Sequence, residues 1–571
     1  MLKSFLSSRL AEILDLNPNH DYVEYPRDVS HGDYASPIAL RLGKEQGRNP
    51  HDVAVEIAKK LEATDLDGFA KLEIAGPGFI NFRLNQKGLL KELNGFLAAP
   101  RHYRLPTPPK NNKIICEYSD PNIAKPLGIH HLLATVIGQS LANIYTYLGY
   151  EVIKINHIGD WGTQFGKLIY AIKQWGDRSQ IDKNPIDELL KLYVKFHEEA
   201  TNKPEIEDLG RTEFKHLEDG DTENRALWKW IVEISMTDVQ KTYDLLGGIT
   251  FDHVLGESFY EKKMAPLIEQ GLKEGIFEAG EGGAIIANFP GTNYPTTIIK
   301  RSDGATVYIT RDIATVQYRV DTWHPAKIVY VVDVAQKLHF EQVFHIAKRL
   351  GLYTPTEVEL EHVIFGRMSF ADKKMSTRKG NILLLDDVLL EAIDRAQAVV
   401  EDKNPDLPAD EKRAVAEMVG VGGVKYAILS QNRMTNIIFS WDKVINLQGN
   451  SAAYLQYTYA RARSIINEFG TTPLTLTGLA EDLTENEKEV LRLIPKFPEA
   501  VVLAAKESKP HFISEYLFDL AQAFNGFYNN DPILKAPKDK KDLRIAICDV
   551  ATQIIKQGLS LLATIDAPER M

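Results

Sequence analysis

The chain has 571 residues, of which 44% are hydrophobic and 25% are charged, and its formal net charge is −11. This composition is that of an ordinary soluble protein with several domains, each large enough to bury a core of its own. The acidic balance disfavours a protein that coats nucleic acid without regard to sequence, because such proteins are normally basic.

Location and redox state are constrained by three further observations. No apolar run approaches the roughly eighteen residues of a membrane helix, so we expect no membrane partner. Residues 1–14 have the pattern of an amphipathic helix that meets Glu12, and not that of a signal peptide. Cys116 and Cys548 lie far apart inside apolar runs, so disulfides are not expected and the predicted location is the cytoplasm.

Residues 1–105 are predicted to form a small α/β domain, followed by a proline-rich linker. Helices are expected at 3–14 and 50–61, and a strand follows the turn Gly76-Pro77-Gly78. In that strand Phe79 and Asn81 share one face. Such a face is either the solvated side of an edge strand or a binding surface.

Residues 110–385 are predicted to form a Rossmann-like domain with a parallel sheet. Residues 113–165 read as strand, polar loop, helix and strand, with Glu117 ending the first strand. This is a βαβ unit, in which a nucleotide binds at the carboxyl end of the first strand. A helical insertion is expected at about 170–246, short β segments at 276–310, and buried strands at 327–333 and 363–370.

The remainder of the chain is predicted to be helical: a connection at 386–449, then an all-α domain at 450–571 with a basic loop at 532–542. Before it, residues 372–381 form a cationic segment that contains Lys374, Met375 and Ser376. Such a segment is either a solvated loop or a source of mobile cations for a phosphate.

Six motifs, in order along the chain, resemble those of arginyl-tRNA synthetases. Residues 121–131, PNIAKPLGIHH, and 374–378, KMSTR, stand where class I synthetases have the HIGH and KMSKS signatures. The others are GDYAS at 32–36, NHIGDWGTQF at 156–165, YLQYTYAR at 454–461 and APERM at 567–571. The resemblance implies a monomeric ligase that joins L-arginine to tRNA(Arg) with ATP, whose Mg²⁺ arrives with the nucleotide.

The resemblance also implies the nucleotide site. The ATP-binding candidates are Gly128, His130, His131, Lys374, Met375 and Ser376, with Lys125, His131 and Lys374 as catalytic residues. Thr377 replaces the second lysine of KMSKS, and Lys125 matches a lysine thought to substitute for it. Aligned without gaps, HIGH becomes Gly128-Ile129-His130-His131. Either the helix start is locally shifted in register, or His130 stacks beside adenine.

For arginine, the spacing of Tyr308 and Asp312 places a phenol and a carboxylate on one helical face, suited to a guanidinium. Asp312 is alternatively a simple acid at a helix start. By resemblance Glu117 and Asn122 also belong to the amino-acid site, and Gln336 to the α-amino end. Asp120, where the family commonly has serine, receives no role, and His157 and Asp160 are either ribose neighbours or a structural turn.

For tRNA, the family likeness assigns residues 1–105 to the tRNA elbow, through Phe79 and Asn81, and 450–571 to the anticodon. Tyr454, Tyr457 and Arg461, with Tyr459 and Arg463, interleave aromatic rings and cations that suit stacking on unpaired bases, although such a stripe is also typical of a core. No CxxC or His/Cys ligand set is present, so no structural metal is expected.

Three alternatives remain open from the sequence alone. A class I synthetase of another amino-acid specificity would share most motifs. A catalytically silent tRNA-binding paralogue would account for the altered first signature. Non-specific RNA binding is the third, and the acidic net charge of −11 disfavours it.

Overall fold

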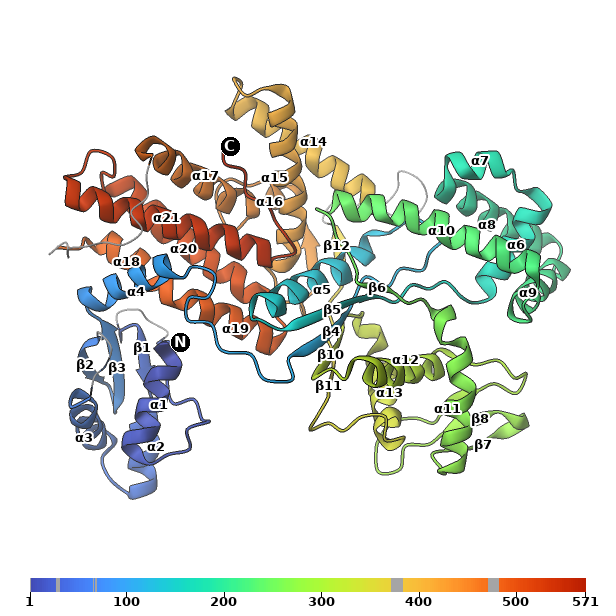
Figure 1. The fold of residues 1–571 in the computed structure, drawn as a ribbon, viewed down its shortest axis with the longest axis horizontal. Coiled ribbons are helices and arrows are strands. Elements are labelled where there is room, and N and C mark those ends of the chain that lie inside the picture. The colour runs from blue at the N-terminus through green and yellow to red at the C-terminus, as the bar shows by residue number, and fades with distance from the viewer. Residues whose placement is uncertain (1, 27–30, 65, 67–68, 371–383, 471–481) are drawn as a thin grey trace.

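The computed structural model describes residues 2–26, 31–64, 66, 69–370, 384–470 and 482–571. Figure 1 shows an N-terminal α/β domain on one side, a parallel sheet in the middle and a helical C-terminal region above and beside it. This arrangement confirms the predicted fold class.

The N-terminal domain has the order α1 (Leu2–Leu14), β1 (Tyr34–Ser36), α2 (Ile38–Gln46), α3 (Pro50–Glu62), β2 (Phe69–Ala75), β3 (Phe79–Leu84) and α4 (Gln86–Ala98). Its antiparallel sheet has the order β1-β3-β2, so β3 is the central strand. The suggestion that β3 is an edge strand is therefore wrong. The sequence does not reveal the short strand β1, which pairs Ala35 with Asn81 and closes that side.

The central sheet consists of β4 (Lys113–Glu117), β5 (Glu151–Asn156), β6 (His253–Val254), β10 (Lys327–Tyr330) and β11 (Glu359–His362). All neighbours are parallel, and the order is β11-β10-β4-β5-β6. The chain moves outward from β4 to β6 and then returns to the other side of β4. The strand order thus reverses between β4 and β10, where open α/β sheets bind their ligands.

Side-chain alternation along the strands separates the two faces of the sheet. Ile114 and Cys116 share a core with α5 (Ile129–Tyr147) and the C-terminal helices. Ile115 shares another core with α11 (Glu261–Lys273), α12 (Tyr308–Trp323) and α13 (Lys337–Arg349). The period of two places successive residues on opposite faces, so both faces are covered and the strands read as continuous apolar runs.

The segment between β5 and β6 is helical, as predicted: α6 (Thr163–Trp175), α7 (Arg178–Lys183), α8 (Pro185–Asn202), α9 (Glu205–Glu218) and α10 (Thr222–Leu245). These helices have a core of their own around Phe165 and Phe196. The glycine-punctuated region forms a small antiparallel sheet, β7 (Phe277–Ala279), β8 (Ile285–Ala287) and β9 (Thr297–Lys300), which also agrees with the prediction.

The strand predicted at 363–370 is wrong in its position. The sheet strand is β11, whose Glu361 forms an ion pair with Lys327 of β10. Val363 and Phe365 are buried, and Val363 N–H still donates to the carbonyl of Tyr330 on β10. The backbone leaves the sheet after Val363, and Gly366 N–H donates to the carbonyl of Arg433. β12 (Met368–Phe370) pairs instead with β13 (Ile437–Phe439) in a separate ribbon. Apolar content predicted burial correctly but not strand pairing.

The C-terminal region contains α14 (Leu385–Lys403), α15 (Ala409–Leu429), α16 (Trp441–Val444), α17 (Ala452–Phe469), α18 (Glu485–Leu493), α19 (Phe497–Glu507), α20 (His511–Asn530) and α21 (Lys538–Leu561). The helical prediction is confirmed, although α21 begins inside the stretch predicted as a basic loop. Among the described helices, none is long and apolar enough to cross a membrane.

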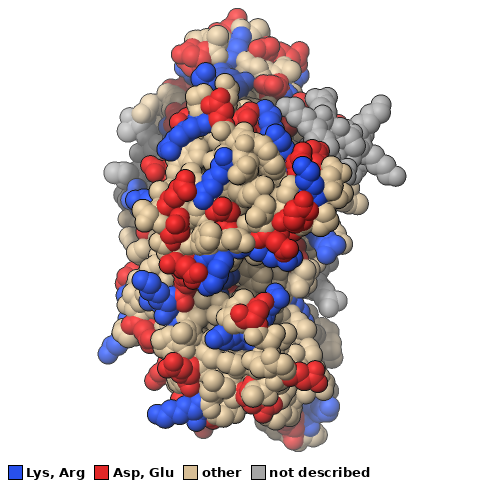
Figure 2. All heavy atoms as spheres, turned by 90° about the vertical axis from the view of Figure 1, so that its right-hand side faces the viewer, with Lys and Arg blue, Asp and Glu red and all other residues tan. Residues whose placement is uncertain are grey.

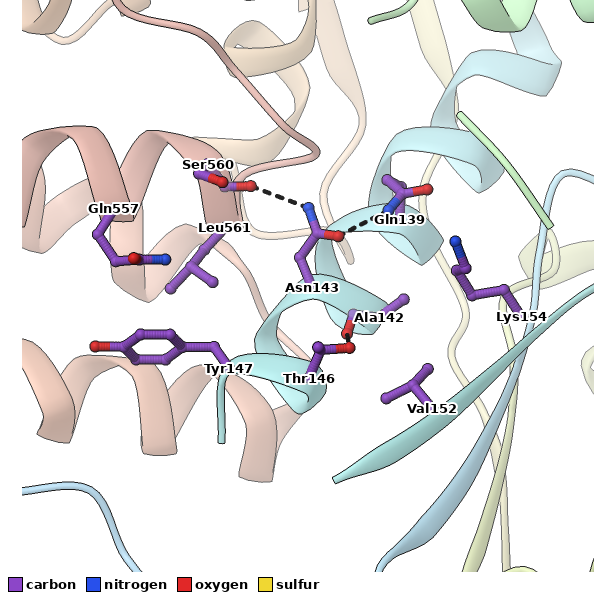
Figure 3. A pocket seen from close by; sticks show the side chains of 10 residues that line it. All are labelled: Gln139, Ala142, Asn143, Thr146, Tyr147, Val152, Lys154, Gln557, Ser560 and Leu561. Atoms are coloured by element: carbon purple, nitrogen blue, oxygen red, sulfur yellow. Dashed lines mark hydrogen bonds between the residues drawn. The ribbon is translucent and has the colours of Figure 1, made fainter. Parts of the chain in front are cut away.

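Helix α5 is shared between the sheet and the C-terminal region. Ser140 Oγ donates to the carbonyl of Leu561 at 2.8 Å, and Asn143 Nδ2 donates to that of Ser560 at 2.9 Å. Figure 3 shows these helices meeting at a groove of about 410 Å³, into which Lys154 of β5 also projects. The helix that follows β4 is therefore fixed at its far end by α21.

Candidate active site

The loop after β4 is conformationally strained. Ser119, Asp120 and Ala124 have positive φ angles of 78°, 46° and 64°. Non-glycine residues adopt this left-handed region at a cost of roughly 1–2 kcal/mol each. The strain lies at the carboxyl end of β4, beside the point where the strand order reverses, which is where a ligand is expected.

Helix α5 begins at Ile129 with Gly128 as its N-cap. Nδ1 of His131 lies 3.1 Å from the backbone nitrogen and 3.2 Å from the carbonyl oxygen of Gly128, so either neutral tautomer of His131 finds a partner at this cap. Burial, and then the neighbouring His130, lower the pKa of His131 to about 4. His131 therefore acts as a cap and, in its Nε2–H tautomer, presents one neutral N–H donor at neutral pH.

The His130 ring contacts that of His131, with centroids 3.9 Å apart and the two planes tilted by 41°. Burial lowers the pKa of His130, and the charge of Asp333 opposes this shift. Asp333 follows β10 and accepts a hydrogen bond from Ala335 N–H at 2.7 Å. Asp333 has no role in the site predicted from the sequence. An acid directly after a buried strand is the signal that would have identified it.

Glu117, at the end of β4, forms an ion pair with Arg319 of α12. Glu117 is 5% exposed and Arg319 is 0% exposed. Nε and Nη1 of Arg319 are buried without a hydrogen-bond partner. The carboxylate predicted to face arginine thus already has a partner inside the protein. Sequence reasoning missed Arg319, which lies 202 residues further along the chain.

Helix α12 also presents the predicted pair Tyr308 and Asp312. Tyr308 is the first residue of the helix and is 67% exposed. One turn later, Oδ2 of Asp312 forms a hydrogen-bonded ion pair with Nε2 of His339 on α13. Between them, Arg311 forms an ion pair with Glu257 at 3.0 Å, and burial raises the pKa of Glu257 to about 7.

Carboxyl groups outnumber guanidinium groups in this region. Burial also raises the pKa values of Asp120 and Asp160. The interacting carboxyls and the two guanidiniums among them are Glu117, Asp120, Asp160, Glu257 and Asp312, with Arg311 and Arg319. A site with excess buried acid is stabilised by a cationic ligand, since the added charge offsets the repulsion and desolvation that raise these pKa values.

The remaining candidates from the first half of the domain are spread around this edge. Asn122 is exposed, and its Oδ1 would lie 2.2 Å from a Cβ at Gly159, so only glycine fits there. Nζ of Lys125 lies 4.6 Å from the ring centroid of Tyr193 on α8. Burial lowers the pKa of Lys125. Gln336 is exposed next to the start of α13.

His157 and Asp160 take part in the turn after β5. His157 N–H donates to Oδ1 of Asp120 at 2.8 Å. The carboxylate of Asp160 accepts from the backbone N–H and the hydroxyl of Ser258 at 2.9 and 2.6 Å. These contacts are those of a structural turn.

Lys374, Met375 and Ser376 lie outside the described residues. The chain on both sides of them is placed. β12 ends at Phe370, and Leu385 N–H donates to the carbonyl of Leu127 at 2.9 Å. The described chain therefore stops at the ribbon of β12 and β13 and resumes beside the N-terminus of α5.

The tRNA candidates differ in exposure. On α17, Tyr457 is 37% exposed, whereas Tyr459 is 2% exposed and belongs to the core. The Arg461 guanidinium lies 5.4 Å from the ring centroid of Tyr457 and 4.0 Å from that of Tyr528 on α20. Tyr454 is half-buried and its hydroxyl accepts from Asn525.

In the N-terminal domain Phe79 is half-buried and Asn81 is 4% exposed. Figure 2, which views the side bearing the helical insertion and β7–β8, shows acidic and basic side chains interspersed. No group of three or more His, Cys, Asp or Glu side chains in the described part of the chain is arranged to hold a metal ion.

Comparison with known proteins extends over the full chain. Residues 92–441 match the family described as tRNA synthetases class I (R), catalytic domain. Residues 1–84 match the arginyl tRNA synthetase N terminal domain, and 455–571 the DALR anticodon binding domain. The arginine–tRNA ligase of Halothermothrix orenii is 40% identical over 98% of both chains, and that of Clostridium perfringens is 38% identical over 100% of both.

The chain belongs to the arginyl-tRNA synthetase family. The solved arginyl-tRNA synthetase of Thermus thermophilus superposes with a TM-score of 0.82 at 25% identity, covering 100% of both chains. That of Plasmodium falciparum has the same fold, with a TM-score of 0.83 at 22% identity. Membership confirms the predicted activity, that of an arginine–tRNA ligase, over the silent paralogue and the synthetase of another specificity.

Proposed function

We propose that arginine is activated at the carboxyl edge of β4 and β10, with its guanidinium on Tyr308 and Asp312 of α12. The single observation that carries this proposal is the excess of buried carboxyl groups around Asp312, because it favours a cationic ligand. Asn122 and Gln336 are then the contacts for the α-amino end. Glu117 acts indirectly, as the acid that Arg319 holds in place.

ATP then lies over the N-terminus of α5, where free N–H groups favour phosphate. Nε2–H of His131 donates to a phosphate oxygen, and Gly128 leaves the backbone accessible. Lys125, Lys374 and the Mg²⁺ that arrives with ATP offset the charge that develops on the phosphates, while Met375 and Ser376 anchor the segment of Lys374. His130 is the residue beside adenine.

The reaction is an in-line displacement at the α-phosphorus. A carboxylate oxygen of arginine forms a bond to phosphorus, the bond to the bridging oxygen breaks, and pyrophosphate leaves with its electron pair. Arginyl-adenylate then transfers arginine to the 3′-terminal ribose of tRNA(Arg), and AMP leaves. The protein's contribution is positioning and electrostatic stabilisation, and no side chain needs to form a covalent intermediate.

For tRNA, the proposed anticodon contacts are Tyr454, Tyr457 and Arg461, which line one surface between α17 and α20. Phe79 and Asn81 are the proposed elbow contacts, and Asn81, at 4% exposure, requires a local rearrangement to reach RNA. We place the enzyme in the cytoplasm as a monomer. The acidic net charge of −11 favours recognition through such local contacts over a broad basic surface.

The test is Asp312→Ala, assayed by tRNA-dependent exchange of pyrophosphate into ATP. Loss of the carboxylate is expected to lower kcat/KM for arginine by about 10²-fold or more, as for other charged hydrogen bonds. KM for ATP is expected to change less than about threefold. Equal loss for both substrates would contradict the guanidinium role of Asp312. Preference for another amino acid would refute the arginine specificity.

A further inference from the structure

Two carboxylates at the proposed arginine site, those of Glu117 and Asp312, each have a basic partner from the protein, which for Asp312 is an imidazole that is cationic only when protonated. Glu117 is paired with Arg319, and Asp312 with His339. The pairs differ in accessibility: the side chain of Arg319 is 0% exposed, whereas those of His339 and Asp312 are 23% and 24% exposed. One pair is sealed inside the domain and the other borders the site.

The pairs also differ in chemistry. A guanidinium remains charged at every physiological pH, so Arg319 cannot release Glu117 by losing a proton. An imidazole changes charge between about pH 5 and 8, so a histidine can hold a carboxylate at one pH and release it at another. A substrate guanidinium that binds Asp312 through both oxygens must approach Oδ2, to which Nε2 of His339 is hydrogen-bonded in the free protein.

We propose that His339 is a positioning residue of the guanidinium site, which holds Asp312 in the free enzyme and yields this contact to arginine. The exchange balances in charge and protons. The guanidinium replaces an imidazolium on the carboxylate, and the imidazole, no longer stabilised by that negative charge, releases one proton to solvent. This inference rests on the proposed role of Asp312.

Several other ionisable groups face His339 or its partner. Asp312 comes from α12 and His362 from β11, where the His362 ring lies 4.5 Å from that of Phe340, the residue next to His339. Asp333 interacts electrostatically with the same His362. On α13 itself, Lys337 and Glu341 form an exposed ion pair. Glu257 interacts with Asp312 and can also release a proton when a cation binds. The test must therefore separate His339 from Glu257.

The exchange also predicts selectivity. A neutral urea of the same shape, as in citrulline, brings no charge to replace the imidazolium, so it leaves the ion pair in place at low pH. Citrulline binding is therefore expected to release fewer protons than arginine binding and to weaken less on acidification, so discrimination against citrulline should be larger at pH 8 than at pH 6. The side chain of lysine has the charge but not the planar fork, so it is excluded by geometry.

The experiment is calorimetry of arginine binding to the full chain saturated with tRNA, in two buffers of different ionisation enthalpy, at about pH 6 and pH 8. Wild-type protein is expected to release protons at pH 6 and fewer at pH 8. His339→Gln keeps a hydrogen-bond donor for Asp312 but cannot lose a proton, so this variant should release fewer protons on arginine binding at pH 6. Glu257→Gln is the matched control, and it should retain the part of the proton release that comes from His339.

Steady-state kinetics supply the second measurement. KM for arginine in the wild type is expected to rise about tenfold between pH 8 and pH 6, as for one linked proton. In His339→Gln the rise should be less than about threefold, with KM at pH 8 close to that of the wild type. His339→Leu, which removes the donor, should raise KM for arginine at both pH values while leaving KM for ATP unchanged.

Identical proton release and identical pH profiles in wild type and His339→Gln would overturn the inference. Its failure is distinguishable from failure of the proposed site. If Asp312→Ala retains normal use of arginine, the guanidinium site itself is wrong. If Asp312→Ala loses arginine and His339→Gln behaves as wild type, only the role of His339 is wrong.

Discussion

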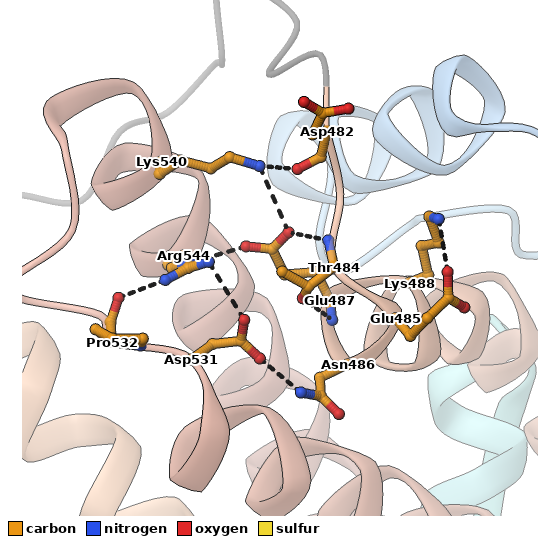
Figure 4. Close-up of polar contacts among 10 residues, drawn as sticks. All are labelled: Asp482, Thr484, Glu485, Asn486, Glu487, Lys488, Asp531, Pro532, Lys540 and Arg544. Carbon is orange, nitrogen blue, oxygen red and sulfur yellow. Dashed lines mark hydrogen bonds and ion pairs between the residues drawn. The ribbon is translucent and has the colours of Figure 1, made fainter.

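Two buried networks of charge in this molecule follow opposite rules. In the C-terminal domain, Glu487 of α18 is 0% exposed and receives Arg544 on one oxygen at 2.7 Å. Its other oxygen accepts from Thr484 N–H at 2.8 Å. Arg544 also reaches Asp531 and the carbonyl of Pro532, and Asn486 donates to the second oxygen of Asp531 (Figure 4). Both oxygens of each carboxylate accept a hydrogen bond, and all three nitrogens of the guanidinium donate one within this closed set.

The network at the end of β4 is incomplete by comparison. Arg319 leaves Nε and Nη1 without partners, Arg311 leaves Nε without one, and Asn156 leaves Oδ1. Burial raises the pKa values of Asp120, Asp160 and Glu257 there. Around Glu487, in contrast, each carboxylate oxygen has a hydrogen-bond partner. A satisfied network stabilises a fold, and an unsatisfied one with perturbed pKa values marks a functional site. The unsatisfied groups at the end of β4 can therefore still bind a ligand, whereas the satisfied groups around Glu487 cannot.

The largest effect is expected from a substitution that breaks the closed network around Glu487. Arg544→Met leaves Glu487 and Asp531 buried without their guanidinium, so the free energy of unfolding should fall by about 3–5 kcal/mol. Thermal or denaturant unfolding of the C-terminal domain measures this loss. Arginine activation, assayed well below the new transition, should remain near normal.

Lys488→Ala, on α18 next to Glu487, is the matched control for Arg544→Met. Lys488 pairs with Glu485, whose side chain is 75% exposed, so its loss should cost less than about 1 kcal/mol. Equal destabilisation by the two variants would mean that closure of the network is not what stabilises this domain.

The next effect concerns pH at the incomplete network. The pKa of Glu257 in the folded protein is about 7, above its ordinary value of 4.5, so the folded state retains a proton that the unfolded state has lost between these pH values. Stability from this group is thus present below about pH 4.5 and is lost as the pH rises to about 7. Glu257→Gln lacks this loss.

The difference in unfolding free energy between Glu257→Gln and wild type should therefore shift by about 2–3 kcal/mol in favour of the variant from pH 5 to pH 8. Chemical denaturation across this range measures it. A pH-independent difference would show that Glu257 is ionised throughout, and that its network is as complete as that of Glu487.

A smaller effect is expected at Lys125, the cation held over Tyr193. Lys125→Ala should lower the rate of tRNA-dependent activation about tenfold, by removing one charge from the developing phosphate, while KM for arginine stays within about twofold. Pre-steady-state formation of arginyl-adenylate is the measurement. Tyr193→Phe keeps the ring, so it should leave the rate unchanged. Wild-type turnover in Lys125→Ala would remove this residue from the mechanism.

The smallest effect lies outside both networks. Tyr457→Ala should weaken tRNA binding by about 1 kcal/mol, roughly fivefold, because one stacking surface beside Arg461 is lost. Filter binding of tRNA measures it, with activation at saturating tRNA as the control. Unchanged affinity would place the anticodon elsewhere on the C-terminal domain.

Much of the fold could be predicted from the sequence because local signals agree with it. The apolar spacing that follows Gly128 defines α5, and residues 327–330 form a buried strand, as expected. Which strands pair with one another was harder to predict from the sequence. The sequence places the apolar run at 363–370, whereas the sheet takes up β11 at Glu359–His362, because Lys327 of the neighbouring strand pairs with Glu361. That choice depends on a residue 34 positions away.

The candidate site shows the same limit. Tyr308 and Asp312 are one helical turn apart, so their common face follows from the sequence. The partners Arg319 and His339 do not, because each meets its carboxylate only through the stacking of α12 and α13 on the sheet. Asn81 was expected on an exposed face, and it is 4% exposed because β3 is the central strand of its sheet. The residue types were enough to predict the chemistry of the site. Which side chains already have a partner within the protein depends on tertiary packing.

The contact of α5 with α21 has a consequence for biosynthesis. Ser140 and its partner Leu561 are separated by 421 positions, so the helix proposed to hold the nucleotide is made long before the residues that fix its far end. At about 5–20 residues per second, the wait on the ribosome is on the order of 20–80 s. During that interval the face of α5 that α21 later covers is exposed, and it is the surface on which a chaperone would act.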